Sequence, residues 1–243
     1  MITMIGTGHV FDIAEPVSFI IKHTWPEAVL VELDENRFKA LMSNNGKKID
    51  PDDLSKDIPK IYRESARYQD KMSAENGVQT GSELLAAINS GILLGAEIIC
   101  IDRDAEQVMR ELEEEMTFME KRKYSVSSFT DRLFGQKKVE STQKDFSENE
   151  EKYVENMRKR YPTLVRKLID ERNTYMADKI REALEKYNNV VVVVGDAHVE
   201  GLCKILEGHP VRKIRLIELM DKERMDGIRS QVWNSKDSKG DSE

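Results

Sequence analysis

The hydrophobic positions of the chain gather in short runs, and two runs that resemble each other stand near its two ends. The strongest run is five valines at residues 190–194. Its β-branched side chains favour a strand, and its apolar character on both faces is typical of the interior of a parallel sheet. A second run, ITMI at residues 2–5, opens the chain. Each run stops near a glycine and gives way to a helical pattern, which is the order of a βαβ unit.

Both runs lead into the same phrase, Gly-x-x-His-Val, at residues 6–10 and 195–199. A helical span and a further apolar run follow each copy, and these runs predict second strands over residues 28–33 and 214–219. We interpret the pattern as a diverged βαβ repeat with one copy at each end. Ligands of open α/β sheets bind at the carboxyl ends of the strands, so both histidines are expected at one sheet edge.

The remaining periodicities fill in the middle of the chain. They predict helices over residues 11–23, 35–43 and 81–94, a strand over 97–101, a helix capped by Asp104 that runs to about residue 124, and one or two long helices over 147–187. The sequence thus predicts an α/β fold with a mainly parallel central sheet built from two terminal βαβ-like repeats. One domain would span residues 1–220, with helical insertions at about 50–80 and 105–165 and a polar, flexible tail over 221–243.

The composition of the chain indicates which kinds of partner and which cellular compartment to expect. A net charge of -7 and a pI near 5.4 argue against a nucleic-acid backbone as the main partner. The two cysteines, Cys100 and Cys203, form no CxxC pair, which excludes a disulfide framework or a zinc finger and suits a cytoplasmic location. Because the first predicted strand begins at residue 2, we expect no secretory leader. No apolar run of the sequence reaches the roughly 18 residues that a membrane span needs.

The two motif histidines, His9 and His198, are the strongest candidates for chemistry. Neutral imidazoles in matched turns could bind one divalent ion, although capping or core histidines that bond to the backbone are the alternative. Glu32 ends an otherwise apolar strand, where a carboxylate is costly to bury unless a cation is near. That cation could be a metal or the neighbouring Arg37. Glu218 holds the same place in the second copy and is a weaker candidate.

Other charged residues could complete a polar cluster at this edge. Arg103 follows the middle strand and could clamp a carboxylate or stabilise an oxyanion, or it could simply form a surface ion pair beside a helix cap. Glu83 and the pair Glu171–Arg172 lie on predicted helices, where ordinary surface charge is the alternative.

Several segments resemble the TraB/PrgY family, in that family's order. They are GTGHV (6–10), VELDENR (31–37), GSELLAAINSGILLGAEIICIDRD (81–104), DERNTYMADKI (170–180) and VVVVGDAHVEGL (191–202). The resemblance covers nearly the whole chain apart from residues 45–80 and 105–165. The paired Gly-x-x-His motifs are also what relates the family to the Tiki metalloproteases and, more distantly, to erythromycin esterase and ChaN-like proteins.

This resemblance implies an α/β fold with one polar cleft and a metal held by His9, His198 and Glu32. Arg103 matches an arginine in an Asp-Arg pair, and Glu171–Arg172 matches a helical Glu-Arg pair. Asp196 departs from the pattern, because small residues are common there. Family members often continue into membrane-spanning segments, so membrane association is expected only through segments absent from this chain. Enterococcal members are associated with limiting a peptide sex pheromone, which fits either cleavage or sequestration.

Two functions therefore stay open. The first is a metal-dependent hydrolase of peptides or proteins that uses zinc or manganese, with Glu83 or Glu171 as general base and Arg103 or Arg172 as oxyanion stabiliser. The second is a non-catalytic module that binds a peptide in the same cleft. The helical insertion could serve as a lid or as the arm of a homodimer.

Overall fold

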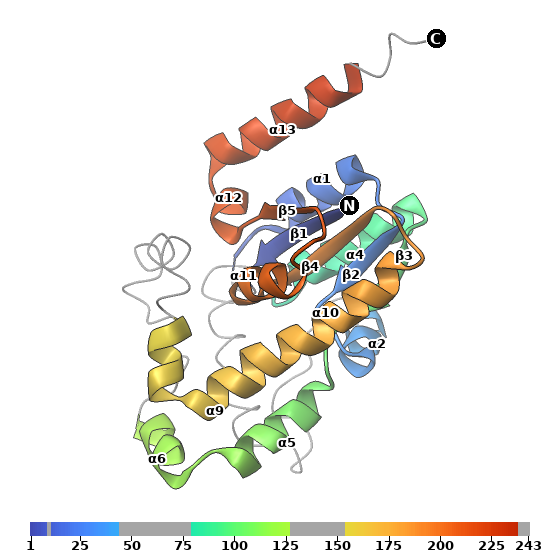
Figure 1. Cartoon of the computed structure of the whole chain (residues 1–243). Coiled ribbons are helices and arrows are strands. Elements are labelled where there is room, and N and C mark those ends of the chain that lie inside the picture. Colours follow the sequence, from blue (N-terminus) through green and yellow to red (C-terminus); the bar gives the residue numbers. More distant parts are fainter. Residues whose placement is uncertain (9–10, 44–78, 127–153, 238–243) are drawn as a thin grey trace.

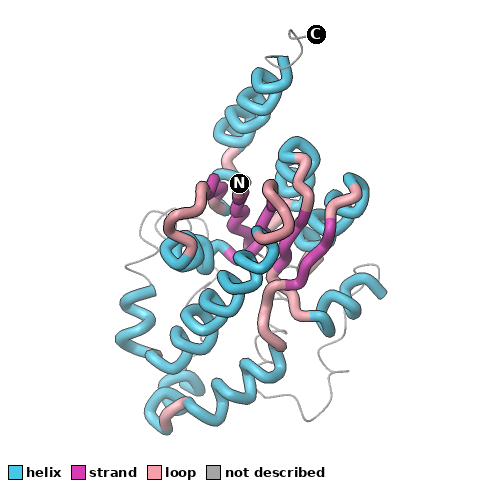
Figure 2. The backbone as a smooth tube through the Cα atoms, turned by 45° about the vertical axis from the view of Figure 1, so that its right-hand side comes forward, coloured by secondary structure: helices cyan, strands magenta, loops and turns pink. Residues whose placement is uncertain are grey.

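The computed structural model describes residues 1–8, 11–43, 79–126 and 154–237. In this part of the chain, five parallel strands form one sheet in the order β3-β2-β4-β1-β5, and helices cover both of its faces (Figure 1). Figure 2 shows the strands as a central layer between the helices. The predicted α/β class with a parallel central sheet is confirmed.

The strands are β1 (Ile2–Thr7), β2 (Ala28–Val31), β3 (Glu97–Cys100), β4 (Val190–Gly195) and β5 (Val211–Ile214). The helices up to residue 126 are α1 (Ala14–Thr24), α2 (Glu35–Ser43), α4 (Ser82–Leu94), α5 (Ala105–Glu115) and α6 (Phe118–Val126). Those that follow are α9 (Pro162–Val165), α10 (Glu171–Leu184), α11 (Asp196–Ile205), α12 (Leu216–Met220) and α13 (Lys222–Asp237), and a π-helical turn (Arg166–Asp170) joins α9 to α10.

The two strands that carry the Gly-x-x-His motifs are neighbours at the centre of the sheet. β1 and β4 pair in parallel from Ile2 opposite Val190 to Thr7 opposite Gly195. β2 pairs with the other side of β4, with Val31 opposite Val193. The carboxyl ends of β1, β4 and β2 therefore meet at one edge, as the repeat predicted.

Alternation along the strands builds two hydrophobic cores, one on each face. Val191 and Val193 of β4 pack with α1 and α4 on one face, whereas Val190, Val192 and Val194 pack with α10 and α11 on the other. A strand buried on both faces has no polar face to maintain, which is why five consecutive valines are tolerated.

The strand predicted over residues 214–219 is wrong. β5 ends at Ile214, and Leu216–Met220 forms the short helix α12. The carboxylate of Glu218 accepts a bond from the backbone N–H of Arg215 at 2.7 Å and closes the first turn of this helix. Glu218 is therefore a capping residue, and a short apolar run alone could not distinguish the two structures.

One further helical prediction is corrected. The helix predicted to run from Asp104 to about residue 124 stops at Glu115 and restarts at Phe118, because Thr117 and Glu120 form a new N-terminal cap. Asp104 itself caps α5 as predicted, accepting the N–H of Gln107 at 2.8 Å.

The tail predicted over residues 221–243 contains a helix, α13, as far as Asp237. Met225 on this helix is buried in the core beside α1, and Arg229 reaches Glu15 at 2.7 Å. The insertion predicted at about residues 50–80 falls largely outside the described residues. Among the helices described, none combines the length and the apolar character needed to cross a bilayer.

Candidate functional site

His198 lies in the first turn of α11, because this helix begins at Asp196, directly after β4. The sequence had placed it in a turn before the helix. Its side chain is buried, and Nδ1 is 2.7 Å from the amide oxygen Oδ1 of Asn173 on α10. A carbonyl oxygen can only accept, so Nδ1 carries a proton. In the neutral ring, the lone pair then resides on Nε2.

Glu32 stands directly after β2 and faces that second nitrogen. Its Oε1 lies 3.4 Å from His198 Nε2, and its Oε2 accepts the backbone N–H of Gly195 at 2.5 Å. Burial alone would raise the pKa of Glu32, but the charges of His198 and Arg172, together with hydrogen bonds from His198 and Gly195, hold it well below its usual value. Two acceptors this close repel, so either a proton on Nε2 or a bound cation must lie between them.

Arg172 joins Glu32 to a second buried carboxylate, Asp102. Its Nη2 bonds to Glu32 Oε1 and, at 2.8 Å, to Asp102 Oδ2, while Nε donates to Asp102 Oδ1 at 2.9 Å. Burial opposes its charge, yet the two carboxylates raise the pKa of Arg172 above its usual value. The ion pair suggested between Glu32 and Arg37 is not the one formed, since Arg37 approaches Asp102 at 3.6 Å.

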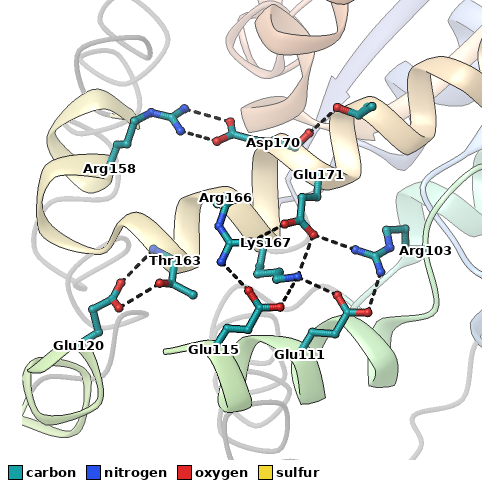
Figure 3. A network of polar contacts seen from close by, with 11 residues as sticks. Arg103, Glu111, Glu115, Glu120, Arg158, Thr163, Arg166, Lys167, Asp170 and Glu171 are labelled. Carbon is teal, nitrogen blue, oxygen red and sulfur yellow. Dashed lines mark hydrogen bonds and ion pairs between the residues drawn. The ribbon is translucent and has the colours of Figure 1, made fainter. Parts of the chain in front are cut away.

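Arg103 and Glu171 belong to a neighbouring network rather than to the His198 cluster (Figure 3). Arg103 pairs with Glu171 at 3.2 Å and with Glu111 at 2.8 Å. Lys167, on the π-helical turn, lies 3.0 Å from Glu171, 3.0 Å from Glu111 and 2.7 Å from Glu115. Burial lowers the pKa of Lys167, but these carboxylates outweigh burial and raise it. The network fixes α5 against the start of α10.

Glu83 lies in the first turn of α4 and is fully buried. Because α4 leads directly into the start of β3, its first turn lies toward the sheet edge where the strands end. Glu83 is thus at the functional edge of the sheet but on the α1–α4 face.

Asp196, the second residue of the motif at 195–199, supports the turn from the inside. Arg215 donates two hydrogen bonds of 2.8 Å to the Asp196 carboxylate, from Nε and Nη2, and the backbone N–H of Leu216 donates a third at 3.0 Å. A side chain at Gly6 would place its Cβ 2.1 Å from Asp196 Oδ1. The first glycine of one motif therefore makes room for a residue of the other.

Sequence reasoning missed Asn173 as the partner of His198. Asn173 is buried, and a methyl group at Gly201 would lie 2.2 Å from its Nδ2, so the glycine in α11 admits the amide. The only available signal was its place directly after Glu171–Arg172 on the same helix.

The metal prediction cannot be completed from the described residues. His9 lies outside them, and among the residues described no three His, Cys, Asp or Glu side chains form a group that could hold an ion. The two described candidates, His198 and Glu32, have the chemistry of metal ligands. Asn173 orients the imidazole of His198 through Nδ1, and the carboxylate of Glu32 faces its Nε2.

Comparison with known proteins gives two matches. The TraB/PrgY/gumN family matches residues 1–209. An uncharacterised protein of Methanocaldococcus jannaschii, MJ1365, is 33% identical over 235 residues, which are 92% of this chain and 58% of that protein. The chain thus spans a little over half the length of this relative.

Proposed function

The chain belongs to the TraB/PrgY/gumN family, and from this premise and the edge geometry we propose that it is a metal-dependent hydrolase acting on peptides or proteins. The proposed metal ligands are His9, Glu32 and His198, with zinc or manganese as the ion. A cytoplasmic location and the lack of a nucleic-acid partner remain part of the same proposal.

The observation that carries the proposal is the approach of Glu32 Oε1 to His198 Nε2 at 3.4 Å. Both atoms are acceptors when the ring is neutral, and a cation between them removes the repulsion. Asn173 fixes the ring from behind, as the outer partners of metal-binding histidines commonly do. β1, which leads into the motif of His9, is the strand next to β4.

The surrounding residues have distinct proposed roles. Arg172 holds Glu32 in place and, being next to the ligands, is better placed than Arg103 to stabilise an oxyanion. The carboxylate of Glu171 already contacts three cations, which leaves Glu83 as the stronger candidate for general base. The ion, when bound, would lower the pKa of a bound water and so supply the nucleophile.

A second candidate function is peptide binding without cleavage in the same cleft. It is favoured by Arg172, whose guanidinium pairs with both Glu32 and Asp102 and so offers a cation to these carboxylates. In that case Nε2 of His198 is protonated, and the cluster is an ion-paired framework.

The test measures metal content by mass spectrometry and cleavage of a peptide library with and without chelator. We expect stoichiometric metal and chelator-sensitive cleavage, both lost in His198→Ala and Glu32→Gln. The matched control is His209→Ala, which removes an exposed histidine after α11. Peptide binding that survives chelation, with no turnover under any divalent ion, would refute the hydrolase and support the binding module.

A further inference from the structure

A groove runs between the edge strand β5 and the face of α13, away from the His198 cluster. It encloses a cavity of about 380 Å³. Arg212, Lys213 and Ile214 of β5 form one wall, and Arg224, Gly227 and Ile228 of α13 form the other. Figure 1 shows β5 at the margin of the sheet, with α12 and α13 following it.

The cavity follows the free edge of β5. Successive side chains of a strand point to opposite faces, so a cavity that contacts three consecutive residues lies along the edge and not over one face. β5 pairs with β1 on one side, and within the described residues its other side has no partner strand. Such an edge offers unpaired backbone N–H and C=O groups to an added strand.

The face of α13 that lines the cavity leaves room for an added strand. Arg224, Gly227 and Ile228 are spaced i, i+3 and i+4, which places them on a single face of α13. A Cβ built on Gly227 would meet no atom within 4 Å, so the groove is open at its middle. Ile214 and Ile228 close the floor of the groove, because both pack into the core that α1 and α4 share.

The charge of the lining is positive although the chain is acidic overall. Three basic residues, Arg212, Lys213 and Arg224, line the groove with one acidic residue, Glu218. Glu218 Oε2 is bonded to the backbone of Arg215, and Lys213 is paired with Glu200 on α11 at 2.9 Å, so the two arginines carry the charge open to an occupant. Arg212 is exposed, and in the described part of the chain its side chain makes no hydrogen bond or ion pair. Arg224 only approaches Asp221, at 3.7 Å. An occupant that carries carboxylates would complement these groups.

We propose that this groove binds an extended acidic peptide, which adds to the free edge of β5 as a further strand. Main-chain bonds to β5 would give affinity, and acidic side chains at alternate positions of the peptide would contact Arg212 and Arg224. Four residues of β5 offer an edge of about 13 Å. This site is separate from the proposed metal site and does not depend on it.

The experiment is fluorescence anisotropy with the full chain and a labelled pool of hexapeptides, in which Asp or Glu alternates with Val, Ile or Leu. We expect saturable binding, and none for a pool with Lys in place of the acidic residues. Arg212→Glu should weaken binding at least about tenfold. Gly227→Phe should abolish it by filling the groove. Lys39→Glu, which reverses an exposed charge on α2, is the matched control and should bind within about twofold of wild type.

A second measurement isolates the backbone contribution. Peptides N-methylated at alternate positions cannot donate to a strand edge, and they should bind at least about tenfold more weakly. The proposal is overturned if the acidic pool fails to bind at about 1 mM. It is equally overturned if the lysine pool or the N-methylated peptides bind as well, or if Gly227→Phe, confirmed as folded by circular dichroism, binds like wild type.

Discussion

Glu120 is predicted to fasten two helices that begin far apart in the sequence. Its Oε1 accepts the N–H of Thr163 at 2.9 Å, and its Oε2 accepts the N–H of Thr117 at 3.0 Å. Both threonine hydroxyls also bond to Oε2, at 2.9 and 3.0 Å. The carboxylate thus caps α6 and α9 together. Figure 3 shows its contact with Thr163.

The substitution Glu120→Gln replaces one acceptor oxygen with an NH₂ group. Whichever oxygen is replaced, the backbone N–H of Thr117 or of Thr163 then faces a donor. Leaving one buried donor unsatisfied costs about 1–3 kcal/mol, so we expect the free energy of unfolding at pH 7 to fall by about 2 kcal/mol. Glu120→Ala, which loses both caps, should cost about 3 kcal/mol.

The cost should also depend on pH in a definite direction. Burial raises the pKa of Glu120, but hydrogen bonds from the backbone and side chains of Thr117 and Thr163 outweigh it and lower the pKa. A lowered pKa stabilises the fold above the unfolded value of about 4.3, and the contribution is lost as pH falls through the folded value. The gap between wild type and Glu120→Gln should therefore be full at neutral pH and shrink on acidification.

Urea unfolding followed by circular dichroism at several pH values measures this gap, and hydrogen exchange at Thr117 and Thr163 locates it. Glu113→Gln, which alters an exposed carboxylate on α5, is the matched control. The reasoning is refuted if Glu120→Gln and Glu113→Gln agree within about 0.5 kcal/mol at neutral pH. A gap that does not change with pH would refute the assigned role of the charge.

Three further predictions test other parts of the fold. Arg215→Met should lower the free energy of unfolding by about 3–5 kcal/mol, because the buried carboxylate of Asp196 loses its cationic partner. Arg110→Met, which breaks an exposed ion pair, is the control, and equal melting temperatures of the two variants would contradict this prediction. Gly201→Ala should lower the free energy of unfolding by about 1–3 kcal/mol, because the added methyl group collides with Asn173. Gly227→Ala, whose methyl group meets no atom, should not destabilise the fold, and equal melting temperatures of the two variants would contradict the contact at Gly201. Partial burial, with smaller contributions from Glu35 and Asp34, raises the pKa of Cys100 to about 12, so iodoacetamide should modify it much more slowly in the folded protein than in urea. Equal labelling rates with and without urea would refute the raised pKa.

The parts of the fold that the sequence predicted are those with strong local signals. The five valines and the twin Gly-x-x-His phrases indicated a parallel sheet with both motif strands at one edge, and β1 and β4 are indeed neighbours. Glu32 and His198 meet there, because strand ends converge whatever the detail of the loops. His9 lies outside the described residues, so its part in the prediction stays open.

The parts that it missed depend on partners distant in sequence. Arg172 was placed in the cluster, but its bond to Glu32 spans 140 residues, and the pattern offered Arg37 as the nearer partner. Asn173 looks like an ordinary polar residue until α10 packs against α11. The tail was predicted to be flexible because Met225 and Ile228 are isolated apolar residues in a polar segment. Both pack into the core that includes α1, and this contact cannot be read from the local sequence.

The order of the strands also governs when the sheet can assemble. β1 and β2 are synthesised first but never touch, because the place between them belongs to β4. On the ribosome, the first two strands must therefore wait for some 190 residues of chain before their common neighbour emerges. Closure of so many intervening residues is entropically slow, which predicts a nascent chain that depends on chaperones until its valine segment arrives. A fragment that ends before residue 190 should accordingly show no cooperative unfolding transition.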